Sequence, residues 1–116
     1  MSASQPISQI SPQDFATYLA TAPVPPQLID VREPQEVAIA RLEGFEVLPL
    51  SQFEQWSPTI QERFAPDAET FVLCHHGVRS EQMCHWLRSQ GFSNVKNIAG
   101  GIAAYAVTVD SSIPQY

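Results

Sequence analysis

Cys74 is the side chain in this sequence whose surroundings best suit nucleophilic chemistry. It follows the apolar run 70–73 and begins the segment Cys74-His75-His76-Gly77-Val78-Arg79-Ser80. Cysteine attacks as a thiolate, and a free thiol with a pKa of about 8.5 is only slightly ionised at neutral pH. Backbone amides in a loop that leads into a helix favour an anion, and Gly77 permits the positive φ of a tight turn. The segment therefore predicts a thiolate nucleophile that is held by main-chain donors and that a reaction partner can reach.

The two cysteines of the chain receive different interpretations. Most free cysteines are small, buried hydrophobic residues, and this is the competing interpretation of Cys74. Its position between an apolar run and an expected helix favours the chemical role. Cys84 lies between Met83 and Leu87 in the expected helix 80–89, so we expect it to pack in the core. A redox pair of Cys74 and Cys84 is a further alternative.

Composition and charge limit the classes of partner. The 116 residues suffice for a single domain, 1–116, and 44 % hydrophobic against 16 % charged residues is typical of a globular chain. A formal net charge of −6 argues against a nucleic acid or an anionic membrane as partner. We recognise neither a signal peptide nor an apolar run of membrane-spanning length. Two cysteines without an export signal lead us to expect a cytoplasmic protein.

Hydrophobic periodicity and turn residues predict strands that alternate with helices. The expected strands are 7–10, 27–31, 47–50, 70–73 and 95–98. The expected helices are one that begins at Pro12 and the segments 33–40, 51–64 with a break before Pro58, 80–89 and 102–105. This alternation predicts an α/β fold: a central, mostly parallel sheet of about five strands with helices on both faces. The site then lies at the carboxyl ends of the strands, where Cys74 falls.

Glycines and polar residues mark the expected boundaries in the last third of the chain. Gly91 suits a left-handed cap after the helix 80–89, and Gly100-Gly101 suits a tight turn. We place the core at about 7–105. The tail 106–116 is polar from Asp110 onward, so we expect it to be loosely held.

Three segments resemble the sequence pattern of rhodanese-like domains. The loop from Cys74 to Ser80 is similar to the family's active-site pattern Cys-x-x-Gly-x-Arg-Ser/Thr. The family's upstream strand-end signature is similar to Asp30-Val31-Arg32-Glu33-Pro34-x-Glu36, and its closing segment is similar to Gly91-Phe92, Val95 and Gly100-Gly101-Ile102. The likeness covers about 7–105 in the family's order. It implies a rhodanese-like fold and a sulfurtransferase of the single-domain thiosulfate type.

The resemblance implies a persulfide mechanism without a cofactor. The Cys74 thiolate would take the sulfane sulfur of thiosulfate or another donor, and the persulfide would pass it to cyanide or a thiol. A small-molecule donor and acceptor are therefore the expected partners, and a sulfur-accepting protein is a further candidate. The implied substrate-binding residues follow the cysteine, namely His75, His76, Gly77, Val78 and Arg79.

Other residues are expected to support the loop rather than to react. Arg79 is expected to anchor the loop to a carboxylate. We expect Asp30 to hold neighbouring loops by accepting backbone hydrogen bonds at its strand end. We expect Arg32 to pair with Glu36 or Glu43. The supporting residues are Asp30, Arg32 and Ser80.

The chain also departs from the family pattern at two places outside the loop. Residues 40–45 stand where many members have Gly-His-Ile before a Gly-Ala, and Tyr105 stands where Trp is common. These differences leave the preferred sulfur donor open.

Three other functions compete with sulfur transfer. A phosphatase of the related fold uses Cys-x5-Arg, whereas Cys74 and Arg79 form Cys-x4-Arg, a ring too tight for a phosphoryl group. A non-catalytic rhodanese-like binding or regulatory module is the alternative, although such modules usually replace the loop cysteine. A metal site at His75, His76 and His85 is disfavoured because adjacent histidines rarely face one ion, so we expect no metal.

Overall fold

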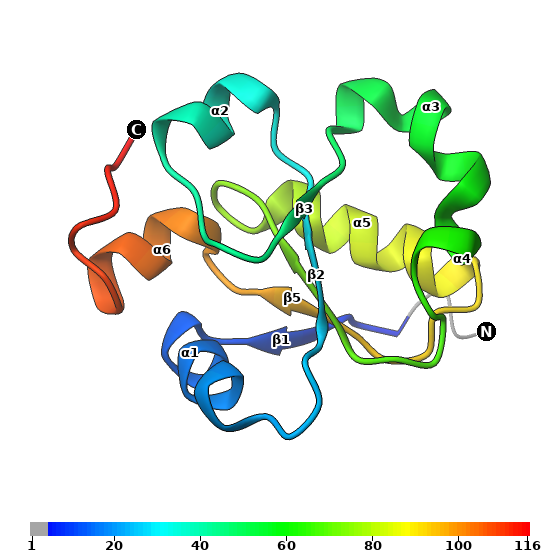
Figure 1. Cartoon of the computed structure of the whole chain (residues 1–116), viewed down its shortest axis with the longest axis horizontal. Helices are drawn as coiled ribbons and strands as arrows, with labels where there is room; N and C mark the ends of the chain where they lie inside the picture. Colours follow the sequence, from blue (N-terminus) through cyan, green and yellow to red (C-terminus); the bar gives the residue numbers. More distant parts are fainter. Residues whose placement is uncertain (1–4) are drawn as a thin grey trace.

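Five parallel strands form one sheet in the order β1-β5-β4-β2-β3 (Figure 1). The computed structural model describes residues 5–116. The strands are β1 Ser8–Ile10, β2 Gln27–Asp30, β3 Glu46–Val47, β4 Thr70–Leu73 and β5 Val95–Ile98. All neighbouring strands are parallel, and Asp30 of β2 lies opposite Leu73 of β4. The carboxyl ends of β2 and β4 therefore meet at the same edge of the sheet.

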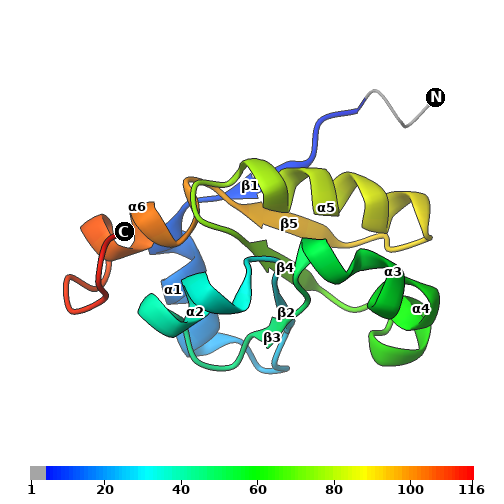
Figure 2. The same ribbon diagram turned by 90° about the horizontal axis from the view of Figure 1, so that it is seen from above.

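Helices cover both faces of this sheet (Figures 1 and 2). α1 Pro12–Thr21 and α6 Gly101–Thr108 pack on one face, and α5 Val78–Ser89 packs on the other. The α5 face is also covered by the consecutive segments η2 Leu50–Gln52, α3 Phe53–Trp56, η3 Ser57–Thr59 and α4 Ile60–Arg63. α2 Pro34–Ile39 follows β2. The expected α/β architecture is confirmed. None of the helices within residues 5–116 combines the length and the apolar character that spanning a bilayer requires.

The central strand β4 places the cysteine on a particular face. All four of its residues are buried. Phe71 and Leu73 pack in the apolar cluster beneath α1 and α6, whereas Val72 and Cys74 belong to the cluster beneath α5. Successive side chains of a strand point to opposite faces, so an unbroken apolar run suits a parallel strand that is covered on both sides. The same alternation directs Cys74 toward the α5 face.

The starts of two helices differ in how well they could be predicted. α1 begins at Pro12, and the hydroxyl of the preceding Ser11 accepts a hydrogen bond from Asp14 N at 3.1 Å. α5 begins at Val78, before the expected start at Ser80. Gly77 acts as its N-cap residue and has a φ of +97°. Because glycine has no side chain to cap the helix, the sequence offers no capping signal at this position.

Three further boundaries differ from the expected ones. β3 is Glu46–Val47 rather than 47–50, because the chain turns into η2 at Leu50. The expected helix 51–64 consists of short α and 3-10 pieces, because Pro58 lies within it and has no backbone N–H for a regular ladder. α6 extends from Gly101 to Thr108, beyond the expected end at 105.

The expectation of a loosely held tail is wrong. Ile113 packs against the apolar cluster beneath α1 and α6. The Asp110 carboxylate accepts hydrogen bonds from Ser112 N at 3.0 Å and Ser112 Oγ at 2.6 Å. The ring of Tyr116 stacks on His75 with centroids 3.8 Å apart. These contacts hold a segment whose polar composition suggested a free end.

Candidate active site

Two hydrogen-bond donors from the segment that follows Cys74 lie within reach of its sulfur. Gly77 N lies 3.0 Å from Cys74 Sγ, and Ser80 Oγ lies 3.3 Å from it. Ser80 belongs to the first turn of α5, where helix N–H groups have no carbonyl partner within the helix. These donors and the positive end of the helix favour negative charge on the sulfur. In the described part of the chain, Gly77 is the loop residue whose amide reaches the sulfur.

The carbonyl groups of the same loop are held by α6. Ile102 N donates to Cys74 O at 2.9 Å, and Ala103 N donates to His75 O at 3.0 Å. Gly101 begins α6 with a φ of +64°, and a Cβ atom there would lie 2.4 Å from His75 O. Only glycine allows so close an approach. The first turn of α6 therefore fixes the peptide groups on either side of the sulfur.

Cys74 is buried, with only 1 % of its surface exposed. We expected a thiol that a donor could reach directly, and this expectation is wrong. The sulfur belongs to the apolar cluster that also contains Val72 and Met83. Burial follows from the strand alternation that directs the side chain beneath α5. Access to the sulfur therefore requires side chains near the loop to move.

Arg79 is bound to a carboxylate, as the sequence led us to expect. Its Nη1 and Nη2 atoms lie 2.8 and 2.9 Å from the two carboxylate oxygens of Glu36. Because Glu36 lies in α2, this ion pair joins the sulfur loop to the segment after β2. The Arg79 hydrogen bonds lower the pKa of Glu36 to about 2 against the opposing effect of burial. Glu36 in turn raises the pKa of Arg79. The charge of Arg79 is thus neutralised by a protein carboxylate.

Arg32 pairs with Asp30, so the expected pairing with Glu36 or Glu43 is wrong. Arg32 Nε lies 3.0 Å from Asp30 Oδ1, and Arg32 Nη2 lies 2.8 Å from Asp30 Oδ2. Both side chains are almost completely buried. Glu36 provides only its backbone carbonyl, 3.4 Å from Arg32 Nη1. Residues i and i+2 of an extended segment share a face, which brings Arg32 back over Asp30.

The expected role of Asp30 as an acceptor of backbone hydrogen bonds is seen at one amide. Arg32 N donates to Asp30 Oδ1 at 3.0 Å. Burial by itself lowers the pKa of Arg32, but the hydrogen bonds to Asp30 and Tyr116 outweigh this effect and raise it. Arg32 therefore stays charged, and its hydrogen bonds to Asp30 stiffen the turn between β2 and α2.

The remaining predicted loop residues lie beside the sulfur rather than on it. His75 is half-buried and stacks on Tyr116, and its ring centroid lies 3.9 Å from that of His76. Burial, followed by the neighbouring His76, lowers the pKa of His75. His76 and Val78 are exposed. These three side chains form the rim of the loop.

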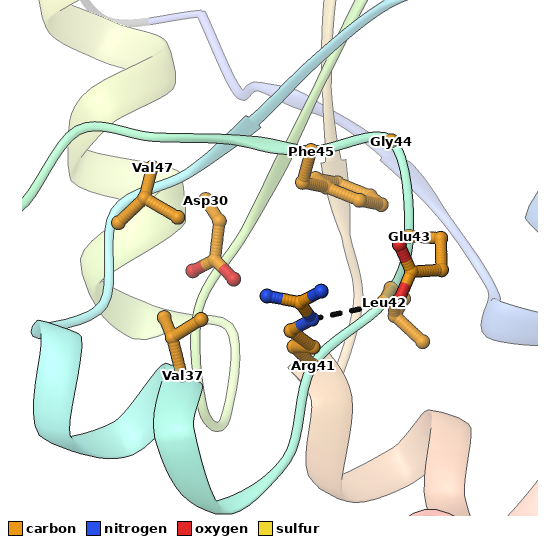
Figure 3. Close-up of a pocket in the computed structure, with 8 residues that line it drawn as sticks. All are labelled: Asp30, Val37, Arg41, Leu42, Glu43, Gly44, Phe45 and Val47. Carbon is orange, nitrogen blue, oxygen red and sulfur yellow. Dashed lines mark ion pairs between the residues drawn. The ribbon is translucent and has the colours of Figure 1, made fainter.

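A small cavity near Asp30 does not include Cys74 (Figure 3). Its volume is about 140 Å³, and its lining residues are Asp30, Val37, Arg41, Leu42, Glu43, Gly44, Phe45 and Val47. Figure 3 shows the Arg41 guanidinium between the carboxylates of Asp30 and Glu43, with Arg41 Nε 3.5 Å from Glu43 Oε2. Glu43 is therefore the partner of Arg41 and not of Arg32. Both members of this pair are exposed, so it contributes little to stability.

Cys84 packs in the core, as expected. It is fully buried, and burial raises the pKa of its thiol to about 12. Both cysteines are free thiols. Among residues 5–116, no three or more His, Cys, Asp or Glu side chains are grouped to hold a metal ion. Cys74 is therefore the thiol whose surroundings favour reactivity.

Sequence reasoning did not identify three contributors to this region. Glu36 was assigned to Arg32 rather than to Arg79. Asn97 is a buried polar residue of β5 that accepts a hydrogen bond from Ser80 Oγ at 2.5 Å. A polar side chain inside the strand 95–98 signals a buried hydrogen bond, so Asn97 could have been found. Tyr116 carried no local signal, because all of its contacts are distant in sequence.

Comparison with known proteins identifies relatives of the whole domain. The family model described as Rhodanese-like domain matches residues 11–108. Rhodanese-like/PpiC domain-containing protein 12, chloroplastic, of Arabidopsis thaliana is 58 % identical over 90 residues, which cover 78 % of this chain and 30 % of that protein. Adenylyltransferase and sulfurtransferase MOCS3-2 of Zea mays is 34 % identical over 95 residues, which cover 79 % of this chain and 20 % of that protein. The chain thus spans less than a third of the length of these curated relatives.

Solved structures share the same fold. The single-domain sulfurtransferase RDL2 of Saccharomyces cerevisiae aligns with a TM-score of 0.77 and 18 % identity, covering 95 % of this chain and 97 % of that one. A rhodanese-like domain protein from Staphylococcus aureus aligns with a TM-score of 0.76 and 22 % identity, covering 95 % and 99 %. At these identities the likeness concerns the fold alone. The name of the Arabidopsis relative places that protein in the chloroplast, and the cytoplasmic location expected for this chain stays a prediction.

Proposed function

The chain belongs to the rhodanese-like domain family, and from this we propose that it is a sulfurtransferase in which Cys74 carries the transferred sulfur as a persulfide. The observation that carries the proposal is the pair of donors at Cys74 Sγ, Gly77 N at 3.0 Å and Ser80 Oγ at 3.3 Å. Donors at the start of a helix stabilise a thiolate, which is the reactive form of cysteine. The sulfurtransferase named among the relatives supports the same class of reaction.

Sulfur transfer takes place in two displacements. The Cys74 thiolate attacks the sulfane sulfur of thiosulfate, a bond forms between these two sulfurs, and sulfite leaves with the electron pair of the broken S–S bond. The acceptor, cyanide or a thiolate, then attacks the outer sulfur of the persulfide. Cys74 leaves as a thiolate with its electron pair. Each step exchanges one bond to sulfur for another, so no oxidant and no cofactor is consumed.

The loop after Cys74 stabilises the negative charge in both steps. Gly77 N acts as a donor of an oxyanion hole does, and the positive end of the α5 dipole adds to its effect. Arg79 and Arg32 support the loop by position, because each is neutralised by a carboxylate. The attraction of an anionic donor therefore rests on main-chain dipoles rather than on these two cations.

A non-catalytic binding module is the second candidate, and the burial of Cys74 favours it. A thiol that is 1 % exposed resembles a core residue, and in such a module no sulfur donor would enter. The two hydrogen-bond donors within reach of the sulfur favour the enzyme, because a core cysteine that only packs needs neither of them. Entry of the sulfur donor in the enzyme requires movement of the rim formed by His75, His76 and Val78.

The proposed partners follow from the proposed reaction. A small-molecule sulfur donor suits this site, because Cys74 Sγ is buried and becomes accessible only when side chains near the loop move. Cyanide or a thiol is the proposed small acceptor, and a sulfur-accepting protein is the alternative acceptor. The net charge of −6 disfavours nucleic acid and anionic membranes.

Turnover of thiosulfate and cyanide by the wild type and by Cys74→Ser tests the proposal. We expect turnover in the wild type and a fall to background in Cys74→Ser, with circular dichroism showing that the variant is folded. Incubation with thiosulfate alone should add the mass of one sulfur atom to Cys74. Cys84→Ala is the matched control, because it removes the other thiol and should keep both activities. A folded wild type that neither turns over nor gains sulfur would favour the binding module.

A further inference from the structure

Ser80 has one hydroxyl proton and two acceptors within reach. Its Oγ atom lies 3.3 Å from Cys74 Sγ and 2.5 Å from Asn97 Oδ1. A hydroxyl donates one hydrogen bond at a time, so the proton serves either the sulfur or the amide oxygen. All three side chains are almost completely buried, and water is not at hand to replace a missing donor. The two acceptors therefore compete for the same proton.

The orientation of the Asn97 amide is determined by its other neighbours. Asn97 Nδ2 lies 3.0 Å from Gly77 O, and a carbonyl oxygen can only accept. The nitrogen must therefore face Gly77, which leaves Oδ1 facing Ser80. The second proton of Nδ2 reaches Gln9 Oε1 at 3.0 Å. Because both Nδ2 protons are hydrogen-bonded, the side-chain amide of Asn97 can flip only if these two bonds break.

The sheet holds this amide in place from both sides. Asn97 lies in β5 between β1 and β4, where it is paired with Gln9 and with Val72. An internal strand moves little, so Oδ1 is a fixed acceptor, whereas the Ser80 hydroxyl is free to rotate. The position of Asn97 thus decides where the Ser80 proton rests.

We propose that Asn97 is a positioning residue that holds the Ser80 proton away from Cys74 and so sets how readily the sulfur becomes anionic. This inference rests on the proposed function, in which the Cys74 thiolate is the nucleophile. Asn97 does not touch the sulfur itself and acts through Ser80. Its second contact, with Gly77 O, also ties it to the residue whose amide reaches the sulfur.

The two ionisation states of the sulfur use the Ser80 proton differently. With a neutral thiol, the Ser80 proton points to Asn97 Oδ1, and the lone pairs of Oγ can accept from the thiol. With a thiolate, the proton turns to the sulfur, and Asn97 Oδ1 then faces the lone pairs of Ser80 Oγ without a proton between them. Asn97 therefore favours the thiol, and ionisation requires the hydrogen bond from Ser80 to Asn97 to break.

A double-mutant cycle on Ser80 and Asn97 tests the proposal through the pH titration of the thiolate. The readout is the ultraviolet absorbance of the thiolate with Cys74→Ser as the blank, because absorbance does not require a reagent to reach a buried sulfur. We expect Asn97→Leu to raise the ratio of thiolate to thiol about tenfold at a given pH. Ser80→Ala should lower this ratio. In the Ser80→Ala background, Asn97→Leu should lose the tenfold gain, because no proton is left to redirect.

The cycle separates the proposed role from a merely structural one. Asn97→Leu also removes the bond to Gly77 O, and an effect through the loop would be equal in both backgrounds. Equal effects, or no gain with Ser80 present, would overturn the proposal. Gln9→Leu is the matched control: it removes a partner of Nδ2 but keeps Oδ1, so the titration should not move. If Asn97→Leu does not fold, Asn97→Ala takes its place in the cycle. Turnover by the wild type tests the proposed function separately, since the titration needs no sulfur donor.

Discussion

The phenol ring of Tyr116 lies parallel to the imidazole of His75, with centroids 3.8 Å apart and an interplanar angle of 5°. The Tyr116 hydroxyl accepts from Arg32 Nη1 at 2.9 Å and donates to Glu36 Oε1 at 3.0 Å. One side chain near the end of the described chain thus contacts the sulfur loop, the β2 turn and α2. It connects the residue next to Cys74 with the two ion pairs that support the site.

Tyr116→Ala should make Cys74 easier to alkylate. The Tyr116 ring packs on His75, the neighbour of Cys74, which is only 1 % exposed. Removal of the ring therefore allows the rim of the loop to move. We expect iodoacetamide to modify Cys74 several-fold faster, as measured by peptide mass spectrometry. Tyr116→Phe keeps the stacking ring and loses the hydroxyl contacts, so its rate should lie closer to that of the wild type. An unchanged rate in Tyr116→Ala would place the barrier to the sulfur elsewhere.

The pH dependence of stability should report the ion pair between Glu36 and Arg79. Arg79 is the main cause of the lowering of the Glu36 pKa from 4.5 to about 2. A lowered pKa in the folded state stabilises the protein above the unfolded value, and this contribution is lost as the pH falls from about 4.5 toward 2. Glu36→Gln should cost about 1 kcal/mol at neutral pH, because Arg79 is partly exposed and solvent screens the pair.

Urea unfolding at a series of pH values measures this contribution of Glu36. The difference in unfolding free energy between the wild type and Glu36→Gln should narrow as the pH falls below about 4.5. Arg79→Lys is the companion variant, since a single ammonium group cannot reproduce the two-point contact of the guanidinium. A difference that stays constant down to the acid limit would show that Glu36 stabilises the fold without its charge.

The core of the fold could be predicted because its signals are local. The run 70–73 is continuous, apolar and followed at once by Cys74, so both the strand and the position of the cysteine at its carboxyl end were evident. Gly91 and the pair Gly100-Gly101 have positive φ values, as their positions after a helix and in a tight turn indicated. Such features depend on a few neighbouring residues, and tertiary contacts do not override them.

The contacts of charged and aromatic residues around the loop could not be predicted in the same way. We expected Glu36 or Glu43 as the partner of Arg32, but Arg32 lies in extended chain before α2, and its side chain turns back over Asp30. The contact between Arg79 and Glu36 depends on how β2, β4 and α2 are arranged in space, because Arg79 follows β4 and Glu36 lies in α2. The contacts of Tyr116 with His75 depend on the path of the whole tail. Each of these pairs is decided by packing between segments distant in the chain.

Gly101→Ala should be much more damaging than Gly91→Ala. Both glycines have positive φ, which costs an alanine about 1 to 2 kcal/mol. A Cβ atom at Gly91 would meet nothing within 4 Å, whereas at Gly101 it would lie 2.4 Å from His75 O and 2.5 Å from Cys74 O. Adding the cost of overpacking against the backbone, we expect Gly101→Ala to lose about 2 to 5 kcal/mol.

Chemical denaturation and turnover together test the glycine pair. Gly91→Ala should keep the turnover of the wild type, because its position lies outside the site. Gly101→Ala should reduce turnover even where it is folded, because the carbonyls of Cys74 and His75 must shift away from α6. Equal losses of unfolding free energy in the two variants would show that the backbone at Cys74 and His75 shifts at little cost, and that α6 does not fix this loop.

Arg32→Met should destabilise the protein strongly, because it leaves the Asp30 carboxylate buried without its partner. Arg32 is 0 % exposed and contacts both carboxylate oxygens of Asp30, so the variant loses the guanidinium hydrogen bonds to both oxygens. Removing one member of a buried pair costs about 3 to 5 kcal/mol, whereas replacing both members by apolar residues is often close to neutral. The double variant Asp30→Leu with Arg32→Met should therefore be more stable than Arg32→Met alone, as measured by urea unfolding. If the two substitutions instead add, each side chain contributes through its own further contacts, such as the bond from Arg32 to Tyr116, and the charge pair itself is worth little.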